Sequence, residues 1–507
     1  MRFSTNTTSQ ILSILALSFF FLQDSASAAD EAEGADALMG PVADWALNIV
    51  FFEIPWTGIP FVLFLLVVSA LFLTLYFGFI NIRGLKRSIR TVKGRYSKES
   101  DPGEITHFQA LSSALSATVG LGNIAGVAIA ITAGGPGAVF WMILCGVLGM
   151  TTKFCECTLG TRYREIDENG KVHGGAMFYL QHGFAELGWA KVGKILAVIF
   201  AGACVMASLG AGNMFQGNQA FEQVLAVTGG SDSFFYGKGW LFGLIMAVFV
   251  AGVILGGIQS IGRVTAKLVP IMCLTYLAAA AYVLFVHSDQ IGSAFGLIFS
   301  EAFSFKAGIG GMIGVMIQGL KRAAFSNEAG FGSAPIAHSA VKTTKPASEG
   351  YVALLEPFVD TVIVCTMTAL VIIITGAQTE GGDWAKAITV TSNAFGSVIS
   401  WFPYVLFAAV LLFAFSTMIS WCYYGEQAWG YLFGKTRRNA FIYKVLFSAV
   451  VVLGCSIKLG NVLDFSDAML FLMCFPNFIG IYVLLPKIKD ELKIFNAHAD
   501  EIDAKLK

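Results

Sequence analysis

Three long apolar segments of the chain carry glycines and polar side chains that could bind a small ligand. The first contains Ser116, Thr118, Gly120, Gly122 and Asn123. Glycine inside a helix costs about 1 kcal/mol relative to alanine, and polar groups in an apolar environment need hydrogen-bond partners. The pattern predicts a break in this helix, where freed main-chain groups must be satisfied by protein, water or a ligand.

The other two segments have a similar composition. One contains Gly210, Gly212, Asn213 and Gln216, and the other runs through several glycines into residues 326–333 (SNEAGFGS). A glycine pair is also typical of close helix packing in membranes. The polar residues beside the glycines favour breaks instead, and secondary transporters place substrate and ions at broken helices near the bilayer midplane.

The composition of the chain is that of a polytopic membrane protein. Of 507 residues, 56% are hydrophobic and only 13% are charged, whereas soluble domains have about 25% charged residues. Lys and Arg number 33, as do Asp and Glu, so no net charge indicates a nucleic-acid partner. A soluble enzyme and a DNA-binding protein are therefore excluded.

Eleven apolar segments are long enough to predict an all-α protein with eleven transmembrane helices. They lie near residues 58–82, 108–131, 136–160, 191–225, 239–259, 264–286, 292–322, 354–377, 390–423, 441–458 and 463–485. Lys and Arg gather in alternate loops, beginning with the loop at 83–98. Because short cytoplasmic loops are rich in these residues, we expect that loop and the C-terminal tail to be cytoplasmic.

The N-terminal residues resemble a secretory signal. A short apolar stretch at 11–22 is followed by Ala26 and Ala28, which fit the small-x-small cleavage pattern. We predict a signal peptide at 1–28 and a periplasmic segment at 29–57, with the new N-terminus outside. The alternative is a first membrane helix, although the stretch is short for one.

Four strings in order resemble the alanine or glycine:cation symporter family. They are residues 116–126 (SATVGLGNIAG), 134–141 (GGPGAVFW), 321–335 (KRAAFSNEAGFGSAP) and 413–426 (FAFSTMISWCYYGE). The resemblance implies a LeuT-type fold of two inverted five-helix repeats with broken helices, at 108–286 and 292–485. A peripheral helix would occupy 58–82, and a cytoplasmic tail 486–507.

The resemblance also implies sodium-coupled symport of alanine, glycine or similar small amino acids by alternating access. Unwinding at Gly120 and Gly122 would aim N–H groups and a helix N-terminus at the substrate carboxylate. Carbonyls near Thr118 and the side chains of Asn123 or Gln216 would hold the ammonium group. Two bulky side chains would limit the substrate's size, namely Phe215 and Trp421.

A sodium site is likewise implied by the resemblance. It would use carbonyls near Ser116 and Val119 with the hydroxyls of Ser416 and Thr417, because a hard cation prefers several oxygen ligands. The alternative for both hydroxyls is a hydrogen bond back to their own helix. Sharing one broken helix would couple the two ligands.

Three carboxylates near the membrane segments are open in role. We expect Glu328 at the cytoplasmic end of its segment, as a cap, loop contact or gate. Glu356 is interpreted as a solvated interfacial residue, with a gate or a proton site as the alternative, and the deeper Asp360 is a functional candidate. No metal-ligand spacing connects the histidines, which we assign to loops or interfaces: His107, His173, His182, His287 and His338.

Competing functions are the same fold carrying another solute or coupled to protons, a membrane enzyme, and a channel. No HExxH, G-x-S-x-G or His/Cys cluster indicates an enzyme, and a carrier suits broken helices better than a channel does. We expect no cofactor besides co-transported sodium. The expected partners are the amino acid, sodium and membrane lipid, without nucleic acid. The transport unit is expected to be a monomer in the inner or plasma membrane.

Overall fold

The computed structural model describes residues 40–304, 308–377, 387–457 and 459–506. The predicted signal peptide at 1–28 lies outside these residues. Within the described ranges, most residues are helical. The strands β1 (Glu165–Ile166) and β2 (Val172–His173) form one antiparallel hairpin.

The first part of the described chain runs from α3 to α14. Its elements are α3 (Phe61–Tyr76), α4 (Ile80–Arg83), α5 (Leu85–Val92), α6 (His107–Thr118), η1 (Leu121–Asn123), α7 (Ala125–Gly134), α8 (Ala138–Arg162), α9 (Ala176–Glu186), α10 (Ala190–Leu209), η2 (Gly210–Met214), α11 (Phe215–Thr228), η3 (Gly230–Asp232), α12 (Gly239–Ile254), α13 (Gly257–Val286), η4 (Ser288–Gln290) and α14 (Ile291–Ala302).

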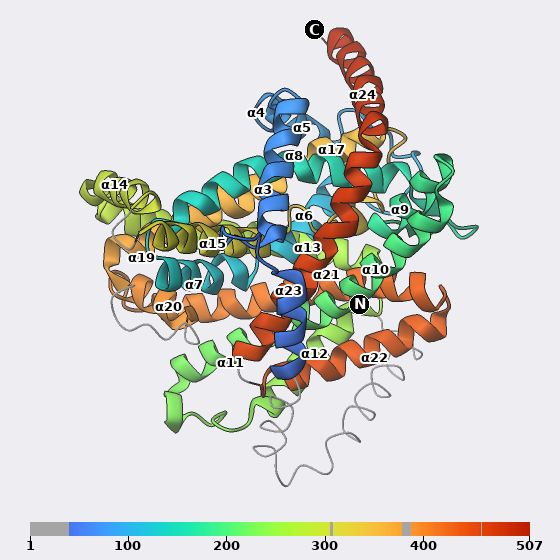
Figure 1. Ribbon diagram of the computed structural model, residues 1–507. Coiled ribbons are helices and arrows are strands. Elements are labelled where there is room, and N and C mark those ends of the chain that lie inside the picture. Colours follow the sequence, from blue (N-terminus) through green and yellow to red (C-terminus); the bar gives the residue numbers. More distant parts are fainter. Residues whose placement is uncertain (1–39, 305–307, 378–386, 458, 507) are drawn as a thin grey trace.

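The second part runs from α15 to the C-terminal helix. Its elements are α15 (Gly308–Asn327), α16 (Pro335–His338), α17 (Pro346–Ala353), α18 (Leu355–Pro357), η5 (Phe358–Cys365), α19 (Thr366–Thr375), α20 (Ala387–Gly396), α21 (Phe402–Phe433), α22 (Arg437–Gly454), α23 (Leu459–Val483) and α24 (Leu485–Lys505). In Figure 1, α4, α5 and the end of α24 lie at the top, α11 and α12 lie at the bottom, and α6 and α21 lie between them.

Among the described residues, six helices are long and apolar enough to cross a membrane. The pair α6 and η1–α7 passes the same test together but is bent by 56°, and α3 and α12 are shorter apolar helices. The chain is therefore a polytopic helical membrane protein, while the number of eleven spans stays a prediction.

The bend between α6 and α7 falls where the glycines predicted it. A capping box of Thr106 and Gln109 starts α6, since a threonine at the cap and a glutamine three residues later satisfy each other's main-chain N–H groups. The helix ends at Thr118, and a short turn, η1, intervenes before α7. This break frees main-chain groups inside the molecule from their regular helical hydrogen bonds.

The predicted break in the second glycine-rich segment is wrong. Residues Ala190–Thr228 form one continuous span, in which η2 is a single π-helical stretch at Gly210–Met214. A π-helical turn widens the helix without giving up its main-chain hydrogen bonds, so the glycines here allow close packing rather than unwinding. The third segment is interrupted: α15 ends at Asn327 and the next helix begins at Pro335.

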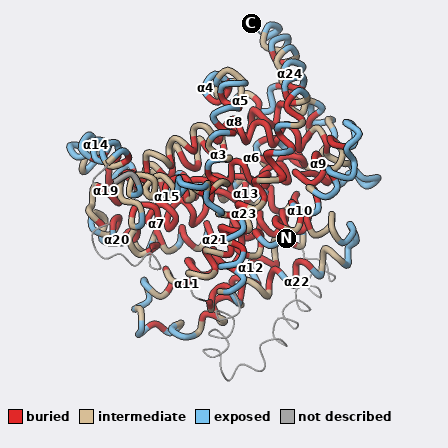
Figure 2. The backbone as a smooth tube through the Cα atoms, viewed as in Figure 1, coloured by how far each residue is buried: buried red, intermediate tan, exposed pale blue. Residues whose placement is uncertain are grey.

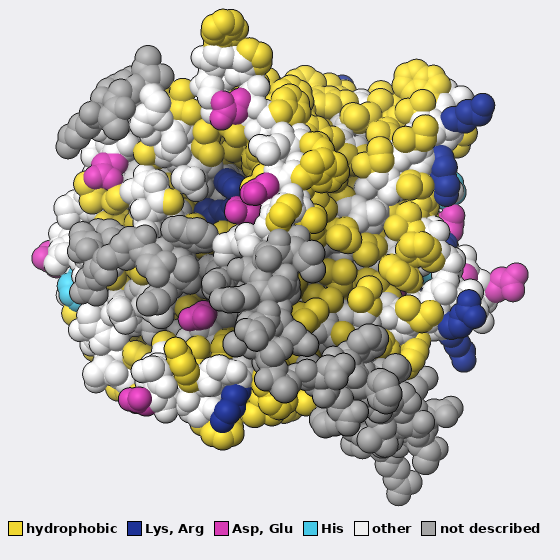
Figure 3. Space-filling view, turned by 60° about the horizontal axis from the view of Figure 1, so that its bottom comes forward, with side chains coloured by type: hydrophobic (Ala, Val, Ile, Leu, Met, Phe, Trp, Pro, Cys, Tyr) yellow, Lys and Arg dark blue, Asp and Glu magenta, His cyan; other side chains and the backbone are white. Residues whose placement is uncertain are grey.

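Buried residues fill the middle of the molecule, and exposed ones gather at the tip of α24 and around α14 and α9 (Figure 2). Large apolar side chains are exposed on the flanks, such as Phe249, Leu274 and Phe285. Figure 3 shows hydrophobic side chains over wide areas of one face. A soluble monomer rarely exposes apolar patches of this extent, so these flanks suit contact with lipid.

Candidate functional site

The break after α6 changes the hydrogen bonding of the Ser116 carbonyl. In a continuous helix, this oxygen would accept from the N–H group of Gly120. That N–H group instead donates to Asn123 Oδ1 at 2.8 Å. The Ser116 carbonyl accepts a hydrogen bond from the Thr417 hydroxyl of α21 at 3.0 Å. The break and α21 are thus joined through a freed main-chain oxygen.

A second main-chain N–H group at the break, that of Leu121, also forms its hydrogen bond outside the regular helical pattern. Leu121 N–H donates to Gln216 Oε1 on α11 at 3.4 Å, and Gln216 Nε2 donates to the Ala211 carbonyl at 3.0 Å. Because the Leu121 N–H group is engaged there, the Ala117 carbonyl has lost its regular helical partner. The glutamine predicted to be in the site therefore lies against the break.

The Asn123 side chain holds the break in place from the other side. Its Nδ2 group donates to Asp360 Oδ1 at 2.6 Å and to the Asp360 carbonyl at 3.1 Å. Asp360 Oδ2 accepts from Ser326 at 2.8 Å and from Thr361 at 2.7 Å. All of these side chains are buried. Both ends of the Asn123 amide are engaged, so this residue positions the break.

Oxygen atoms also gather between the end of α6 and α21. Ser116 Oγ donates to the Ser416 carbonyl at 2.6 Å and accepts from Ser420 Oγ at 3.1 Å. The Ser416 hydroxyl donates to the Phe413 carbonyl of its own helix at 3.0 Å, which is the alternative that the sequence left open. Val119 follows α6 directly with a non-helical ψ of 88°. Serine and threonine oxygens with freed carbonyls are the ligands that a hard cation requires.

A small enclosed cavity adjoins the break. Its volume is about 10 Å³, close to the minimum for a single water molecule. Every residue around it is buried. The lining residues are Ala117, Thr118, Gly122, Ala211, Gln216, Phe325, Glu328, Trp421 and Leu470.

The cavity brings together four of the seven residues predicted to bind substrate: Thr118, Gly122, Gln216 and Trp421. The other three, Gly120, Asn123 and Phe215, are not among the lining residues. The ring of Phe215 packs behind the wall against Phe325, with 5.1 Å between the ring centroids. The structure thus gives the role of apolar wall to Phe325.

Glu328 lines the cavity, although it was not predicted to bind substrate. It does lie at the end of its segment, directly after α15, but its carboxylate is buried at the cavity. Glu328 Oε1 accepts a hydrogen bond from Trp421 Nε1 at 3.0 Å, and Oε2 accepts one from Ser333. The residue follows α15 with a φ of 56°. A carboxylate within an apolar segment is a functional candidate in its own right, which was the signal for it.

Two further assignments from the sequence are wrong. Glu356 is not solvated at an interface, because it is completely buried and lies 3.1 Å from Lys153 Nζ. His107 starts α6 and His338 ends α16, and both are buried rather than lying in loops or at interfaces. Long-range packing brings these groups together, and no sequence spacing reveals it.

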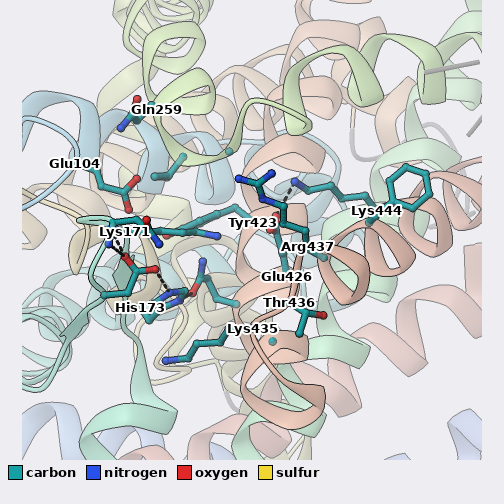
Figure 4. A pocket seen from close by; sticks show the side chains of 18 of the residues that line it. Glu104, Lys171, His173, Gln259, Tyr423, Glu426, Lys435, Thr436, Arg437 and Lys444 are labelled. Carbon is teal, nitrogen blue, oxygen red and sulfur yellow. Dashed lines mark hydrogen bonds and ion pairs between the residues drawn. The ribbon is translucent and has the colours of Figure 1, made fainter. Parts of the chain in front are cut away.

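A larger and more open cavity, of about 670 Å³, lies between the β1–β2 hairpin, the α12–α13 turn, α21 and α22 (Figure 4). Glu104, Gln259, Tyr423 and Glu426 line it. Burial raises the pKa of Glu104. Burial and the nearby ammonium group of Lys435 lower the pKa of His173. This cavity lies apart from the break, whereas the small cavity adjoins it.

Comparison with known proteins agrees with this arrangement. The model of the sodium:alanine symporter family matches residues 45–506. The chain is 40% identical over 440 residues to the sodium/alanine symporter AgcS of Methanococcus maripaludis, covering 86% of this chain and 94% of that one. It is 32% identical over 430 residues to a probable sodium/glutamine symporter, GlnT, of Bacillus subtilis, covering 85% and 86%.

The fold has a solved counterpart. The structure of MhsT in complex with L-phenylalanine superimposes with a TM-score of 0.52 at 16% identity, covering 76% of this chain and 98% of that one. At this level of identity the match shows a common fold and nothing about the ligand.

The broken helix, the buried oxygens of α6 and α21 and the family match over most of the chain lead to one conclusion. The chain belongs to the sodium:alanine symporter family and is a membrane transporter that couples amino-acid movement to sodium.

Proposed function

We propose that this protein carries alanine, glycine or another small neutral amino acid together with sodium by alternating access, at the break between α6 and α7. The observation that carries the proposal is the meeting of freed main-chain oxygens, buried hydroxyls and an enclosed cavity at this one break. The proposed residues are those predicted from the sequence, with Glu328 and Phe325 added and with Asn123 in a positioning role.

The break presents opposite polarities to a zwitterionic substrate. The C-terminal end of α6 carries partial negative charge, whereas the start of η1 and α7 carries partial positive charge. A substrate carboxylate placed near Gly122 would face the N-terminal groups. Its ammonium group would face the end of α6 near Thr118 and the carboxylate of Glu328. Both substrate charges then have partners without any Lys or Arg lining the cavity.

The cavity favours a small side chain. Trp421 and Phe325 form bulky walls, and the volume of about 10 Å³ is too small for an amino acid unless the walls move. A pocket distinguishes one methylene group by about 1–3 kcal/mol, so alanine and glycine would both be accepted. The name of the AgcS relative agrees with alanine, and that of GlnT shows that relatives differ in substrate.

Sodium would bind on the α21 side of the same break. Ser116, Val119, Ser416 and Thr417 would supply its oxygens. The Thr417 hydroxyl donates its hydrogen to the Ser116 carbonyl, so its lone pairs would be available to the ion. Each ligand would then order the segment that the other needs, and this coupling favours binding both together.

Alternating access would use the predicted organisation of the spans in the membrane. Eleven spans would form a peripheral helix at 58–82 and inverted repeats at 108–286 and 292–485. A single chain would form the transport unit. The ends bearing α5 and α24 would face the cytoplasm of an inner or plasma membrane, where the basic loops are. The open polar cavity of Figure 4 would then be the cytoplasmic vestibule.

The test is uptake of labelled alanine into proteoliposomes with and without an inward sodium gradient. We expect sodium-dependent uptake that glycine inhibits, that Thr417→Ala reduces at least about tenfold, and that Thr417→Ser largely retains, because losing one charge-assisted contact costs about 1.5–3 kcal/mol. Uptake driven by a proton gradient without sodium would refute the proposed coupling. Sodium-dependent uptake unaffected in Thr417→Ala would refute the ion site alone.

A further inference from the structure

A row of buried ionisable side chains lies outside the central cavity. Its members come from α6, from α8 and from the segment that holds α16, α17 and α18, three parts of the chain that are distant in sequence. Each is at most 4% exposed. In order of contact they are His107, Glu349, His338, Glu356 and Lys153.

The first part of the row begins at a hydroxyl group. Ser97 Oγ lies 2.6 Å from His107 Nε2. His107 Nδ1 contacts Glu349 Oε1. Since Ser97 can donate to Nε2 and the ring can donate from Nδ1, a neutral His107 satisfies both contacts. This histidine requires no additional proton.

His338 is different because carboxylates flank both of its ring nitrogens. Nδ1 contacts Glu349 Oε2, and Nε2 lies 2.6 Å from Glu356 Oε1. A neutral imidazole has a single N–H group, and an ionised carboxylate only accepts hydrogen bonds. The two contacts therefore require two protons between three groups. A neutral histidine with two ionised carboxylates offers only one proton for these contacts. The three groups therefore hold one additional proton.

The surrounding charges place that proton on the ring. Glu356 Oε2 lies 3.1 Å from Lys153 Nζ, and Glu349 also contacts His107, so both carboxylates are stabilised in the ionised form. With an imidazolium at His338, two positive charges balance two negative ones, which a buried cluster requires. Although burial lowers it, the carboxylates of Glu356 and Glu349 raise the pKa of His338 to about 9.

Other groups that face the cluster are consistent with this assignment. Cys157 of α8 lies with His338 and Glu356 so closely that their ligand atoms are within 4.8 Å of one another. A metal ion there would meet the Lys153 ammonium group and two ring nitrogens that are already engaged. Arg164 donates to carbonyls just after His338, including that of Ser339 at 2.7 Å. The carboxylates of Glu328 and Glu156 also act on the Lys153 ammonium group.

We propose that His338 is a resident proton-binding site, an imidazolium that clamps Glu349 of α17 to Glu356 of α18. Through Glu349 and His107 the clamp also fastens the first turn of α6, the half of the broken helix that ends at the ligand site. The proton is a bound ligand of this clamp. Only the consequence for transport, through movement of α6, rests on the proposed function.

The first test observes the ring directly. The full chain, labelled with ¹⁵N-histidine and placed in lipid nanodiscs, is examined by NMR at about pH 7.5, one unit above the ordinary histidine pKa. We expect an imidazolium signal that is lost in His338→Gln and kept in the control His182→Gln, a half-exposed residue paired with Glu165. Loss of a neutral-imidazole signal in His338→Gln would overturn the proposal.

If His338→Gln does not fold, a second variant tests the same proposal. Glu349→Gln removes one of the carboxylates, so we expect the His338 signal to titrate at a pH at least one unit lower than in the wild type. A titration at the same pH in both would contradict the clamp.

The clamp also makes a pH-dependent contribution to stability. A histidine pKa raised from 6.5 to about 9 on folding stabilises the folded state fully below about pH 6.5, and this stabilisation is lost as the pH rises through about 9. The difference in Tm between wild type and His338→Gln should therefore shrink over that range. A difference that does not change with pH would refute the assignment.

Hydrogen exchange tests the link to α6. At one fixed pH, we expect main-chain N–H groups in the first turn of α6 to exchange several-fold faster in His338→Gln than in His182→Gln. Equal rates would refute the fastening role. None of these measurements uses transport, so their failure is distinct from failure of the proposed function.

Discussion

Glu328 brings a buried carboxylate to the cavity, where the indole of Trp421 donates to it at 3.0 Å. The Ser333 hydroxyl donates to its other oxygen. These two donors are neutral, and although the Lys153 ammonium group acts on the carboxylate, no cation is among the residues that line the cavity. A substrate ammonium group would supply it, since buried charges are stabilised by pairing.

Glu328→Gln should weaken alanine binding. Losing a charge-assisted hydrogen bond costs about 1.5–3 kcal/mol, which corresponds to an affinity about 10- to 150-fold lower. The measurement is the Kd for alanine at saturating sodium by calorimetry. The matched control is Glu491→Gln, a carboxylate on α24 paired with Arg162, which should leave the Kd unchanged. Wild-type affinity in Glu328→Gln would remove the residue from the site.

Four of the residues predicted from the sequence to bind substrate line the small cavity at the break. Thr118 and Gly122 flank it, and Gln216 and Trp421 stand in polar or aromatic strings on other segments. Glu328 was not predicted to bind substrate because it stands at the end of an apolar segment, where a carboxylate suits a cap or a loop contact. It does follow the end of α15, but tertiary packing buries it at the cavity.

At the scale of elements, close packing of the α10–α11 span against α21 is essential. The π-helical stretch η2 brings Gly212 so near to Trp421 that a Cβ atom at this position would collide with the Trp421 side chain. On the same span, a Cβ at Gly202 would meet nothing within 4 Å. Alanine substitutions of these two glycines therefore give a test variant and a matched control.

Gly212→Ala should displace Trp421 and distort the cavity wall. We expect a loss of about 1–3 kcal/mol in the free energy of unfolding, the usual cost of overpacking, and at least a tenfold loss of alanine uptake. Gly202→Ala should leave uptake unchanged and not lower the Tm. The measurements are uptake in proteoliposomes and thermal unfolding in detergent. Equal behaviour of the two variants would contradict this packing.

The elements were predictable to different extents. The break after α6 follows from Gly120, Gly122 and Asn123 in one apolar run, and the structure places it there. The π-helical stretch carries nearly the same residue types at Gly210–Met214. Whether a glycine pair unwinds a helix or admits a neighbour depends on what packs against it, and only tertiary structure supplies that.

At the scale of the whole molecule, one bent span connects three regions. Its first half begins at His107, beside the buried histidine and carboxylate cluster, and ends at the cavity. The Ser116 carbonyl near that end is bonded to Thr417 of α21. A ligand that orders the break therefore changes contacts with α21, which is the physical route for coupling proposed here.

Composition and hydropathy were sufficient to predict a polytopic helical protein, because a membrane span requires a long apolar run. They could not predict the buried row from His107 to Lys153. Its members are spread from residue 107 to residue 356 and meet only through the packing of five helices.

The central claim is that sodium and the amino acid share the break after α6, and equilibrium binding tests it most directly. The Kd for alanine is measured over a range of sodium concentrations, and the Kd for sodium over a range of alanine, in wild type, Thr417→Ala and Thr417→Ser. We predict that each ligand tightens the other by the same factor, as linkage requires, and that this factor falls toward one in Thr417→Ala only. An alanine Kd that does not change with sodium in the folded wild type would contradict the account.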